Sequence, residues 1–210
     1  MGADAFRGRV QVYTGEGKGK TTAALGLALR AAGRGLATYI GQFMKGPPAG
    51  EAYGRGERPS LRPEGRPAGE AGAQARDATP TGELEAPRLT GGLVEIEQYG
   101  SAERFARKEA PAAADAARAR AGLQRARAAM RSGRYRIVVL DEACTAVEFR
   151  LLAADDLLAL VNERPADVEL VLTGRGAPEA LLEAADLVTE MREVKHYYRE
   201  GLAARDGIER

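Results

Sequence analysis

A glycine-rich segment near the amino end combines residue types that bind phosphate. Residues 15–19 contain three glycines, and Lys20 and Thr21 follow directly. Backbone N–H groups turn inward around phosphate oxygens where φ is positive and no Cβ atom intrudes, so all three glycines are expected to adopt that conformation. Lys20 supplies a positive charge, and the Thr21 hydroxyl is a ligand for Mg²⁺. The segment therefore predicts a P-loop that binds a polyphosphate.

The spacing of this loop departs from the usual P-loop pattern. A glycine normally stands five residues before the Gly-Lys-Thr triplet, but Thr14 occupies that position here. The predicted loop is short and dense in glycine. An apolar strand precedes it, and the helix that follows adds its positive dipole end to anion binding. We expect a nucleotide to contact the whole loop, which comprises Thr14, Gly15, Glu16, Gly17, Lys18, Gly19, Lys20, Thr21 and Thr22.

Two acidic residues follow the most apolar stretch of the chain. Residues 137–140 read Ile-Val-Val-Leu, and Asp141 and Glu142 come next. Continuous apolar runs are typical of parallel strands buried on both faces, and P-loop proteins hold Mg²⁺ where such a strand ends. One carboxylate can bind the ion directly or through water, while the other orients ligands around it. The alternative is that Asp141 only caps the next helix.

Short β-branched runs alternate with helical patterns, which indicates a parallel sheet covered by helices. The expected fold class is α/β, with residues 137–140 as a central strand. Gly33 and Gly35 are expected to end the first helix in left-handed conformations. The expected strands are 9–13, 37–43, 93–98, 137–140, 168–172 and 187–191, and the expected helices are 20–32, 111–131, 154–163 and 178–185.

Residues 47–82 differ in composition from the rest of the chain. They contain six of the ten prolines and almost no large apolar side chains. Such a segment cannot bury enough surface to offset the entropy lost on ordering. We interpret residues 1–210 as a single domain with a disordered insertion at 47–82. Balanced charges favour a passive loop, and the alternative is a lid that orders over the site.

Composition argues against several classes of function. The formal net charge is +1, so nucleic acid is not an expected partner. No signal core is present, and no apolar run approaches the ~20 residues of a membrane span, which favours a cytoplasmic protein without a membrane partner. Cys144 and His196 are the only cysteine and histidine, so neither an internal disulfide nor a zinc site is expected.

Six ordered motifs lie at residues 14–22, 42–46, 97–100, 139–142, 172–178 and 185–196. Together they resemble one family, the ATP:corrinoid adenosyltransferases of cobalamin synthesis and salvage, over nearly the whole chain outside the insertion. The resemblance implies a RecA-like P-loop fold, usually a homodimer, that transfers the 5′-deoxyadenosyl group of MgATP to the reduced cobalt of a corrinoid. Triphosphate is released. The resemblance also implies that ATP lies reversed relative to its orientation in P-loop hydrolases, with the ribose C5′ exposed to the acceptor.

The resemblance implies roles for single residues. Lys20, Thr21 and Glu142 are expected to be catalytic, by stabilising negative charge and holding the metal ion. Thr21, Asp141 and Glu142 are the predicted Mg²⁺ ligands. Arg175 is expected either to contact the nucleotide or to form a surface ion pair.

The corrinoid side of the site is less specified by the sequence. Tyr99, Phe105 and His196 are the candidates for corrinoid contacts, and the chain lacks the tryptophan that some family members place beneath the ring. The alternatives are that Phe105 belongs to the core and that His196 is a structural hydrogen-bonding residue. A reductant or flavoprotein reductase is an expected partner, because the cobalt must arrive reduced.

Two other classes of function share these features. The loop and the acidic strand end would also suit an ATP-hydrolysing or small-molecule kinase domain, or a nucleotide-binding module without turnover. The sequence has neither a guanine-reading motif nor the Leu-Ser-Gly-Gly signature of transport ATPases. Adenosyl transfer fits a chain so poor in cysteine and histidine, because reduced cobalt is itself the nucleophile.

Overall fold

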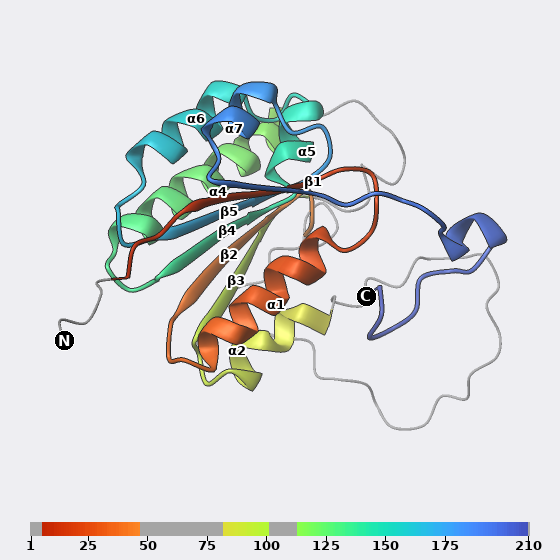
Figure 1. Ribbon diagram of the computed structural model, residues 1–210, viewed down its shortest axis with the longest axis horizontal. Coiled ribbons are helices and arrows are strands. Elements are labelled where there is room, and N and C mark those ends of the chain that lie inside the picture. The colour runs from red at the N-terminus through yellow and green to blue at the C-terminus, as the bar shows by residue number, and fades with distance from the viewer. Residues whose placement is uncertain (1–5, 47–81, 101–112, 210) are drawn as a thin grey trace.

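The computed structural model describes residues 6–46, 82–100 and 113–209 (Figure 1). Six strands form one sheet in the order β3-β2-β4-β5-β1-β6, and every neighbouring pair is parallel. The predicted α/β class is confirmed. The strands are β1 (Val10–Thr14), β2 (Thr38–Phe43), β3 (Val94–Tyr99), β4 (Ile137–Asp141), β5 (Glu169–Thr173) and β6 (Leu187–Glu190).

The apolar strand β4 lies inside the sheet, as predicted. All five of its residues are buried, and its neighbours are β2 and β5. A strand covered on both faces needs apolar side chains at successive positions, which is why β4 shows no alternation. The edge strand β3 is only partly buried after Val94, and it alternates apolar with polar residues.

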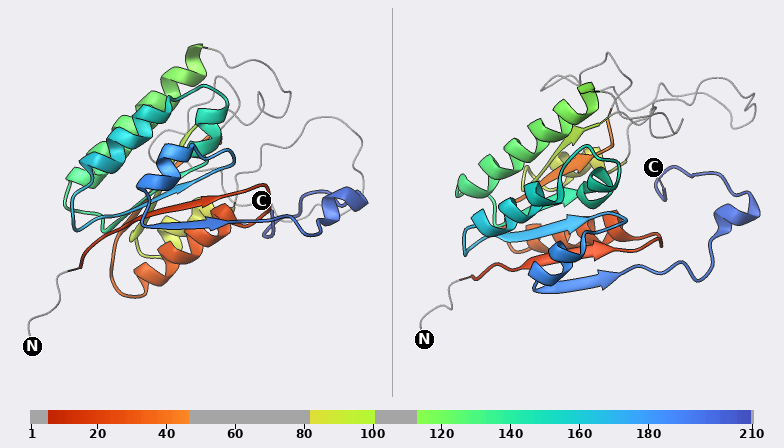
Figure 2. Two further views of the ribbon diagram at one scale, coloured as in Figure 1. Left: turned by 45° about the horizontal axis from the view of Figure 1, so that its top comes forward. Right: turned by 90° about the horizontal axis from the view of Figure 1, so that it is seen from above.

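Helices cover both faces of the sheet (Figures 1 and 2). Side chains of β4 alternate between two apolar clusters, with Val138 and Leu140 in one and Ile137 and Val139 in the other. Each fully buried leucine or valine contributes roughly 1.5–3 kcal/mol. The helices are α1 (Lys20–Ala32) and α2 (Ala86–Leu89) on one face, and α4 (Ala113–Arg131), α5 (Ala143–Glu148), α6 (Ala154–Glu163) and α7 (Glu179–Ala184) on the other.

The end of α1 differs from the prediction. Gly35 has the expected positive φ of 71°, but Gly33 has a φ of −61° and continues the right-handed turn. The Gly33 N–H still donates to the Leu29 carbonyl. The predicted left-handed conformation of Gly33 is therefore wrong, because a single such residue two positions later ends the helix.

Four short elements were not predicted from the sequence. They are the 3₁₀ helix η1 (Gly82–Glu85), α2, α5 and the 3₁₀ helix η2 (Tyr197–Glu200). Their four to six residues are too few to show a helical period. Apart from Gly82, the predicted insertion at 47–82 lies outside the described residues, as does Pro111 at the expected start of α4.

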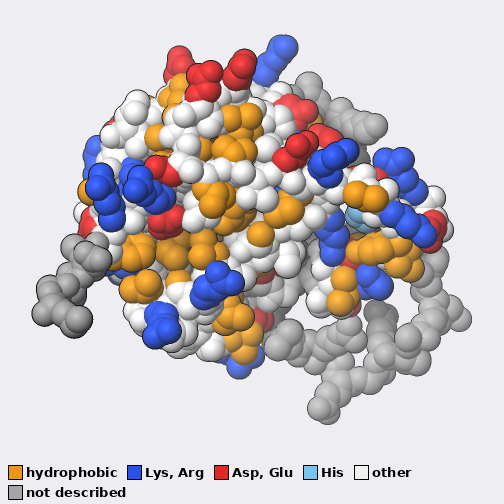
Figure 3. Space-filling model, in the orientation of Figure 1, with side chains coloured by type: hydrophobic (Ala, Val, Ile, Leu, Met, Phe, Trp, Pro, Cys, Tyr) orange, Lys and Arg blue, Asp and Glu red, His pale blue; other side chains and the backbone are white. Residues whose placement is uncertain are grey.

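The carboxyl ends of all six strands meet at one edge of the sheet, and the tail passes close to it. After β6 the chain runs to the 3₁₀ helix η2 (Tyr197–Glu200), which stands away from the sheet (Figures 1 and 2). Acidic and basic side chains are interspersed on the surface in Figure 3. None of the helices in the described part of the chain is long and apolar enough to cross a bilayer.

Candidate active site

The glycine-rich loop, residues 15–19, joins β1 to α1 at the carboxyl edge of the sheet. Gly15 and Gly19 have positive φ values of 92° and 124°, as predicted. Gly17 does not, so that part of the prediction is wrong. Its need for glycine is steric, because a Cβ atom there would lie 2.7 Å from both the Met191 carbonyl oxygen and the Arg192 carbonyl carbon.

A backbone segment that follows β6 closes against this loop. The Gly17 N–H donates to the Met191 carbonyl at 2.6 Å, and the Met191 N–H donates to the Thr14 carbonyl at 2.8 Å. Sequence reasoning did not predict this contact, because it joins segments far apart in the chain. It shows that the loop is shaped by the segment after β6 as well as by its own glycines.

Alanine at position 17 should therefore disturb the loop. We expect Gly17→Ala to lower ATP affinity about tenfold or more, since the Met191 segment must shift by tenths of an ångström to admit the methyl group. Equilibrium binding of ATP to Gly17→Ala and to its control variant checks this. The matched control is Gly26→Ala in α1, where a Cβ would meet nothing within 4 Å and alanine favours helix. Equal ATP affinity of the two variants would contradict the expectation.

Lys20, the first residue of α1, turns back over the loop that precedes it. Its Nζ donates to the Gly15 carbonyl at 2.6 Å and to the Gly17 carbonyl at 2.9 Å, and the residue is only 6% exposed. Burial lowers the pKa of Lys20, and the nearby Glu142 carboxylate opposes that shift. The ammonium is thus held within the loop that would receive phosphate.

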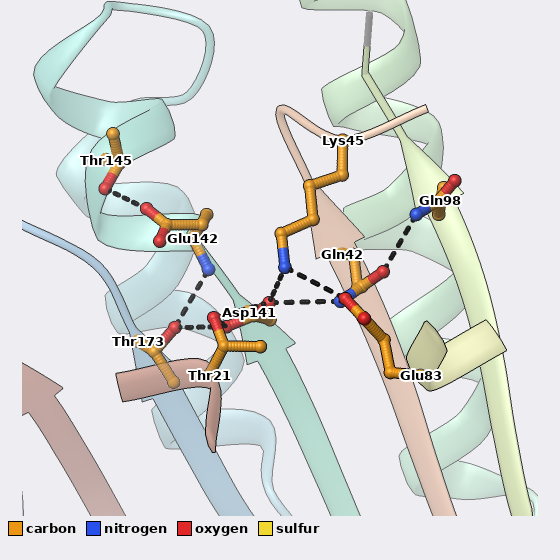
Figure 4. Close-up of polar contacts among 9 residues, drawn as sticks. All are labelled: Thr21, Gln42, Lys45, Glu83, Gln98, Asp141, Glu142, Thr145 and Thr173. Atoms are coloured by element: carbon orange, nitrogen blue, oxygen red, sulfur yellow. Dashed lines mark hydrogen bonds and ion pairs between the residues drawn. The ribbon is translucent and has the colours of Figure 1, made fainter. Parts of the chain in front are cut away.

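Asp141 lies at the centre of a network of hydrogen bonds at the end of β4 (Figure 4). Its carboxylate is fully buried and accepts from the Thr21 hydroxyl at 2.9 Å and the Thr173 hydroxyl at 2.7 Å. It also accepts from Gln42 Nε2 at 3.3 Å and Lys45 Nζ at 3.1 Å. The structure therefore brings together Thr21 and Asp141, two of the three predicted metal ligands.

The Glu142 side chain points in a different direction from the Asp141 side chain (Figure 4). It has a φ of 62°, a strained value for a residue with a side chain, and it occupies the N-cap position of α5. Its carboxylate accepts from the Thr145 hydroxyl at 2.5 Å, and its N–H donates to Thr173 Oγ1 at 2.9 Å. Because Glu142 holds the N-cap position, the alternative role of Asp141 as a helix cap is wrong.

Besides Thr173 and Thr145, which bond to Asp141 and Glu142, four residues of the network had no role predicted from the sequence. Gln42 bridges Asp141 to Gln98, and Lys45 bridges Asp141 to Glu83 (Figure 4). Gln42, Lys45 and Gln98 lie in two of the six motifs, which was the only available signal. Glu83 lies in no motif.

The charge on Lys45 is well compensated. Burial opposes the charged form, but the Asp141 and Glu83 carboxylates outweigh it and raise the pKa of Lys45. Lys45 Nζ lies 3.1 Å from Asp141 Oδ2 and 3.3 Å from Glu83 Oε1. Lys45 is therefore a cation held between two carboxylates beside the predicted metal ligands.

The remaining predicted nucleotide contacts lie at the rim of the loop. Glu16 and Arg175 form an exposed ion pair at 3.4 Å. Lys18 lies 3.5 Å from Glu209 of the tail, and Thr22 is exposed on α1. The surface ion pair, which is the alternative to nucleotide contact predicted for Arg175, is therefore present. It places the Arg175 guanidinium next to the loop.

Tyr99 and His196, the two candidate corrinoid residues that the structure describes, have different partners. Tyr99 ends β3 and donates its hydroxyl hydrogen bond to Glu97, with its ring packed against Gly122 of α4. His196 accepts from the Tyr198 N–H through Nδ1 at 3.0 Å and caps η2, which fits its structural alternative. Phe105 lies outside the described residues.

The donors at the end of β4 suit a magnesium ion. Thr21 Oγ1 and Asp141 Oδ1 lie 2.9 Å apart, and both are hard oxygen ligands of the kind that Mg²⁺ prefers. Mg²⁺ keeps several waters and needs only one or two protein ligands beside phosphate oxygens. The residues therefore fit the ion. The Glu142 carboxylate, the third predicted ligand, accepts from the Thr145 hydroxyl.

Comparison with known proteins gives one consistent result. The family model described as ATP:corrinoid adenosyltransferase BtuR/CobO/CobP matches residues 6–58 and 74–210. The chain is 32% identical over 203 residues to the corrinoid adenosyltransferase of Escherichia coli K12, covering 97% of this chain and 86% of that protein. It is 32% identical over 207 residues to the corrinoid adenosyltransferase CobA of Salmonella typhimurium LT2, and the match covers 99% of this chain and 88% of that protein. The corrinoid adenosyltransferase of Pseudomonas aeruginosa is 32% identical over 205 residues, and the match covers 97% of this chain and 84% of that protein.

Proposed function

The chain belongs to the ATP:corrinoid adenosyltransferase family, and from this premise we propose how its residues transfer the adenosyl group of ATP to a corrinoid. The reduced cobalt of the corrinoid attacks the ribose C5′ of ATP. A cobalt–carbon bond forms, the bond from C5′ to the α-phosphate oxygen breaks, and triphosphate leaves with the electron pair. The reaction belongs to cobalamin metabolism.

The protein does not need to supply a nucleophile for this reaction. Burial raises the pKa of the Cys144 thiol to about 12, so it stays protonated at neutral pH. The contributions left to the protein are positioning, which can supply several kcal/mol, and stabilisation of the charge that develops on triphosphate. Both tasks suit the glycine-rich loop and the residues that surround it.

We assign the triphosphate to the loop and to Lys20. When phosphate enters, the Lys20 ammonium exchanges its contacts with the Gly15 and Gly17 carbonyls for phosphate oxygens. Arg175, already beside the loop through Glu16, adds a second positive charge at the rim. We propose that triphosphate held in this way lies with the ribose C5′ toward the acceptor, which is the reversed nucleotide orientation that the family resemblance implies.

We assign the magnesium ion to Thr21 and Asp141. The ion, when bound, neutralises part of the phosphate charge. Thr21 would present its hydroxyl oxygen to the ion, and Asp141 accepts from Thr21 and so fixes the direction of that hydroxyl. Glu142 acts on Lys20 by its charge, and the strained backbone at Glu142 is maintained by Thr145 and Thr173.

The chemistry of the reaction implies one partner beyond ATP and corrinoid. A reductant or flavoprotein reductase must deliver the cobalt in its reduced state. We further propose a homodimer without nucleic-acid or membrane partners. A cytoplasmic location would provide ATP and keep the lone thiol of Cys144 reduced.

The observation that carries this assignment is the meeting of Thr21 and Asp141 next to the Lys20 loop, at the edge where parallel α/β sheets bind ligands. Anaerobic absorption spectroscopy of protein, chemically reduced corrinoid and ATP tests it. We expect the absorption of reduced cobalt to disappear only when ATP is present, and a light-sensitive cobalt–carbon bond to form. ATP consumed to ADP with an unchanged corrinoid spectrum would favour the hydrolase or kinase alternative.

A further inference from the structure

The Asp141 carboxylate has no acceptor capacity left for a metal ion or for a metal-bound water. A carboxylate offers about four lone-pair sites. Oδ1 accepts from Thr21 and Thr173, while Oδ2 accepts from Gln42 and Lys45 and shares the Thr21 hydroxyl at 3.2 Å. Metal can therefore interact with Asp141 only after one of these donors has left.

Three of the four donors are poor candidates for departure. Thr21 is itself a proposed metal ligand. Thr173 is fully buried and also accepts the Glu142 N–H, so its loss would release the strained turn. Gln42 is fully buried and is held by Gln98 at 2.9 Å.

Lys45 differs from these three donors in charge and position, although the buried Gln42 amide also donates to Glu83, at 3.1 Å. Lys45 is the cation of the set, its side chain is 27% exposed, and it stands just after the end of β2. It has a second carboxylate partner in Glu83, at 3.3 Å. An ammonium and a magnesium ion at the same carboxylate would also repel each other. Lys45 is thus the donor that can move without leaving a charge unpaired.

We propose that Lys45 is an exchangeable counter-ion of Asp141, which it neutralises in the metal-free protein and yields to Mg²⁺ when the nucleotide complex forms. This inference rests on the proposed metal site at Thr21 and Asp141. Displaced Lys45 stays with Glu83, so neither carboxylate becomes uncompensated. The tethered ammonium disfavours metal without nucleotide, and Mg²⁺ is therefore loaded together with ATP.

Binding of Mn²⁺, an ion detectable by electron paramagnetic resonance, tests the exchange without ATP or corrinoid. In Lys45→Met the competing charge is absent, and we expect Mn²⁺ to bind about tenfold more tightly than to the unaltered protein. Lys45→Arg keeps the charge and should bind Mn²⁺ as weakly as the unaltered protein. Lys195→Met is the matched control, because Lys195 is 82% exposed and pairs with Glu200.

Thermal unfolding provides a second measurement on the same proteins. Lys45→Met leaves the buried Asp141 without its cation, so it should unfold at a lower temperature than the unaltered protein in a chelating buffer. Mn²⁺ should recover more of the melting temperature in this variant than in Lys45→Arg. If Lys45→Met folds only when Mn²⁺ is present, that result also supports the exchange.

Asp141→Asn separates failure of this inference from failure of the proposed site. Combining it with Lys45→Met should abolish the gain in Mn²⁺ affinity. If Asp141→Asn weakens Mn²⁺ binding but Lys45→Met changes neither affinity nor melting behaviour, the metal site stands and the exchange is refuted. If neither substitution affects Mn²⁺ binding, the metal site at Asp141 is refuted and the exchange with it.

Discussion

Lys20→Ala is expected to lower the rate of adenosyl transfer by about 10²–10³-fold, the usual cost of removing one preorganised donor to a developing negative charge. The Lys20 ammonium is buried within the loop and reaches the Gly15 and Gly17 carbonyls, so it is already placed where triphosphate would lie. Charge on triphosphate grows as the bond to C5′ breaks. The loss should therefore appear mainly in kcat.

Anaerobic rates of cobalt–carbon bond formation, measured over a range of ATP concentrations, test this expectation. The control is Lys195→Ala, which removes an exposed lysine paired with Glu200. A Lys20→Ala variant that is folded by circular dichroism and retains near-normal kcat would refute the role of Lys20. A rise in KM alone would show that Lys20 binds ATP without stabilising the departing triphosphate.

Asp141→Ala is expected to affect stability as well as activity. The substitution removes the acceptor of Thr21, Thr173, Gln42 and Lys45 at once. Breaking a buried ion pair by removing one partner costs about 3–5 kcal/mol. Because Lys45 retains Glu83, we expect a loss near the lower end, about 3 kcal/mol in the free energy of unfolding.

Urea unfolding of the metal-free proteins measures this difference. Asp167→Ala is the matched control, because Asp167 pairs with Arg136 at the surface and is 54% exposed. Exposed ion pairs contribute about 0–1 kcal/mol, so the control should unfold close to the unaltered protein. Similar losses in the two variants would contradict the buried network at Asp141.

Local patterns in the sequence predict most of the fold. The boundaries of α1 and α6 are predicted to the residue, and those of the strands to within one residue, because apolar runs and glycine or proline punctuation are local signals. Two errors concern backbone detail. Gly33 is right-handed, and Gly17 is required by the close approach of Met191, a contact between distant segments that no local pattern encodes.

The site is predicted less completely than the fold. Lys20, Thr21 and Asp141 are found because each stands next to a local signal, the glycine-rich loop or the apolar strand. Lys45 and Glu83 are not found from the sequence. Their contacts at the site form only because β2 pairs with β4, which places the end of β2 beside Asp141.

Residue identity alone also fails to give the direction of a side chain. Tyr99 is a predicted corrinoid contact, and the structure shows that its hydroxyl donates to Glu97 and its ring packs on α4. Strand alternation explains this, since Glu97 and Tyr99 share the face toward α4 while Ile96 packs on the opposite face.

The most direct test of the central claim is the identity of the phosphate product. We propose that the loop holds ATP with C5′, not the γ-phosphorus, facing the acceptor. Phosphorus NMR after a single anaerobic turnover with reduced corrinoid should show one intact inorganic triphosphate for each adenosylated corrinoid. ADP and orthophosphate, formed in proportion to the ATP consumed, would contradict this orientation.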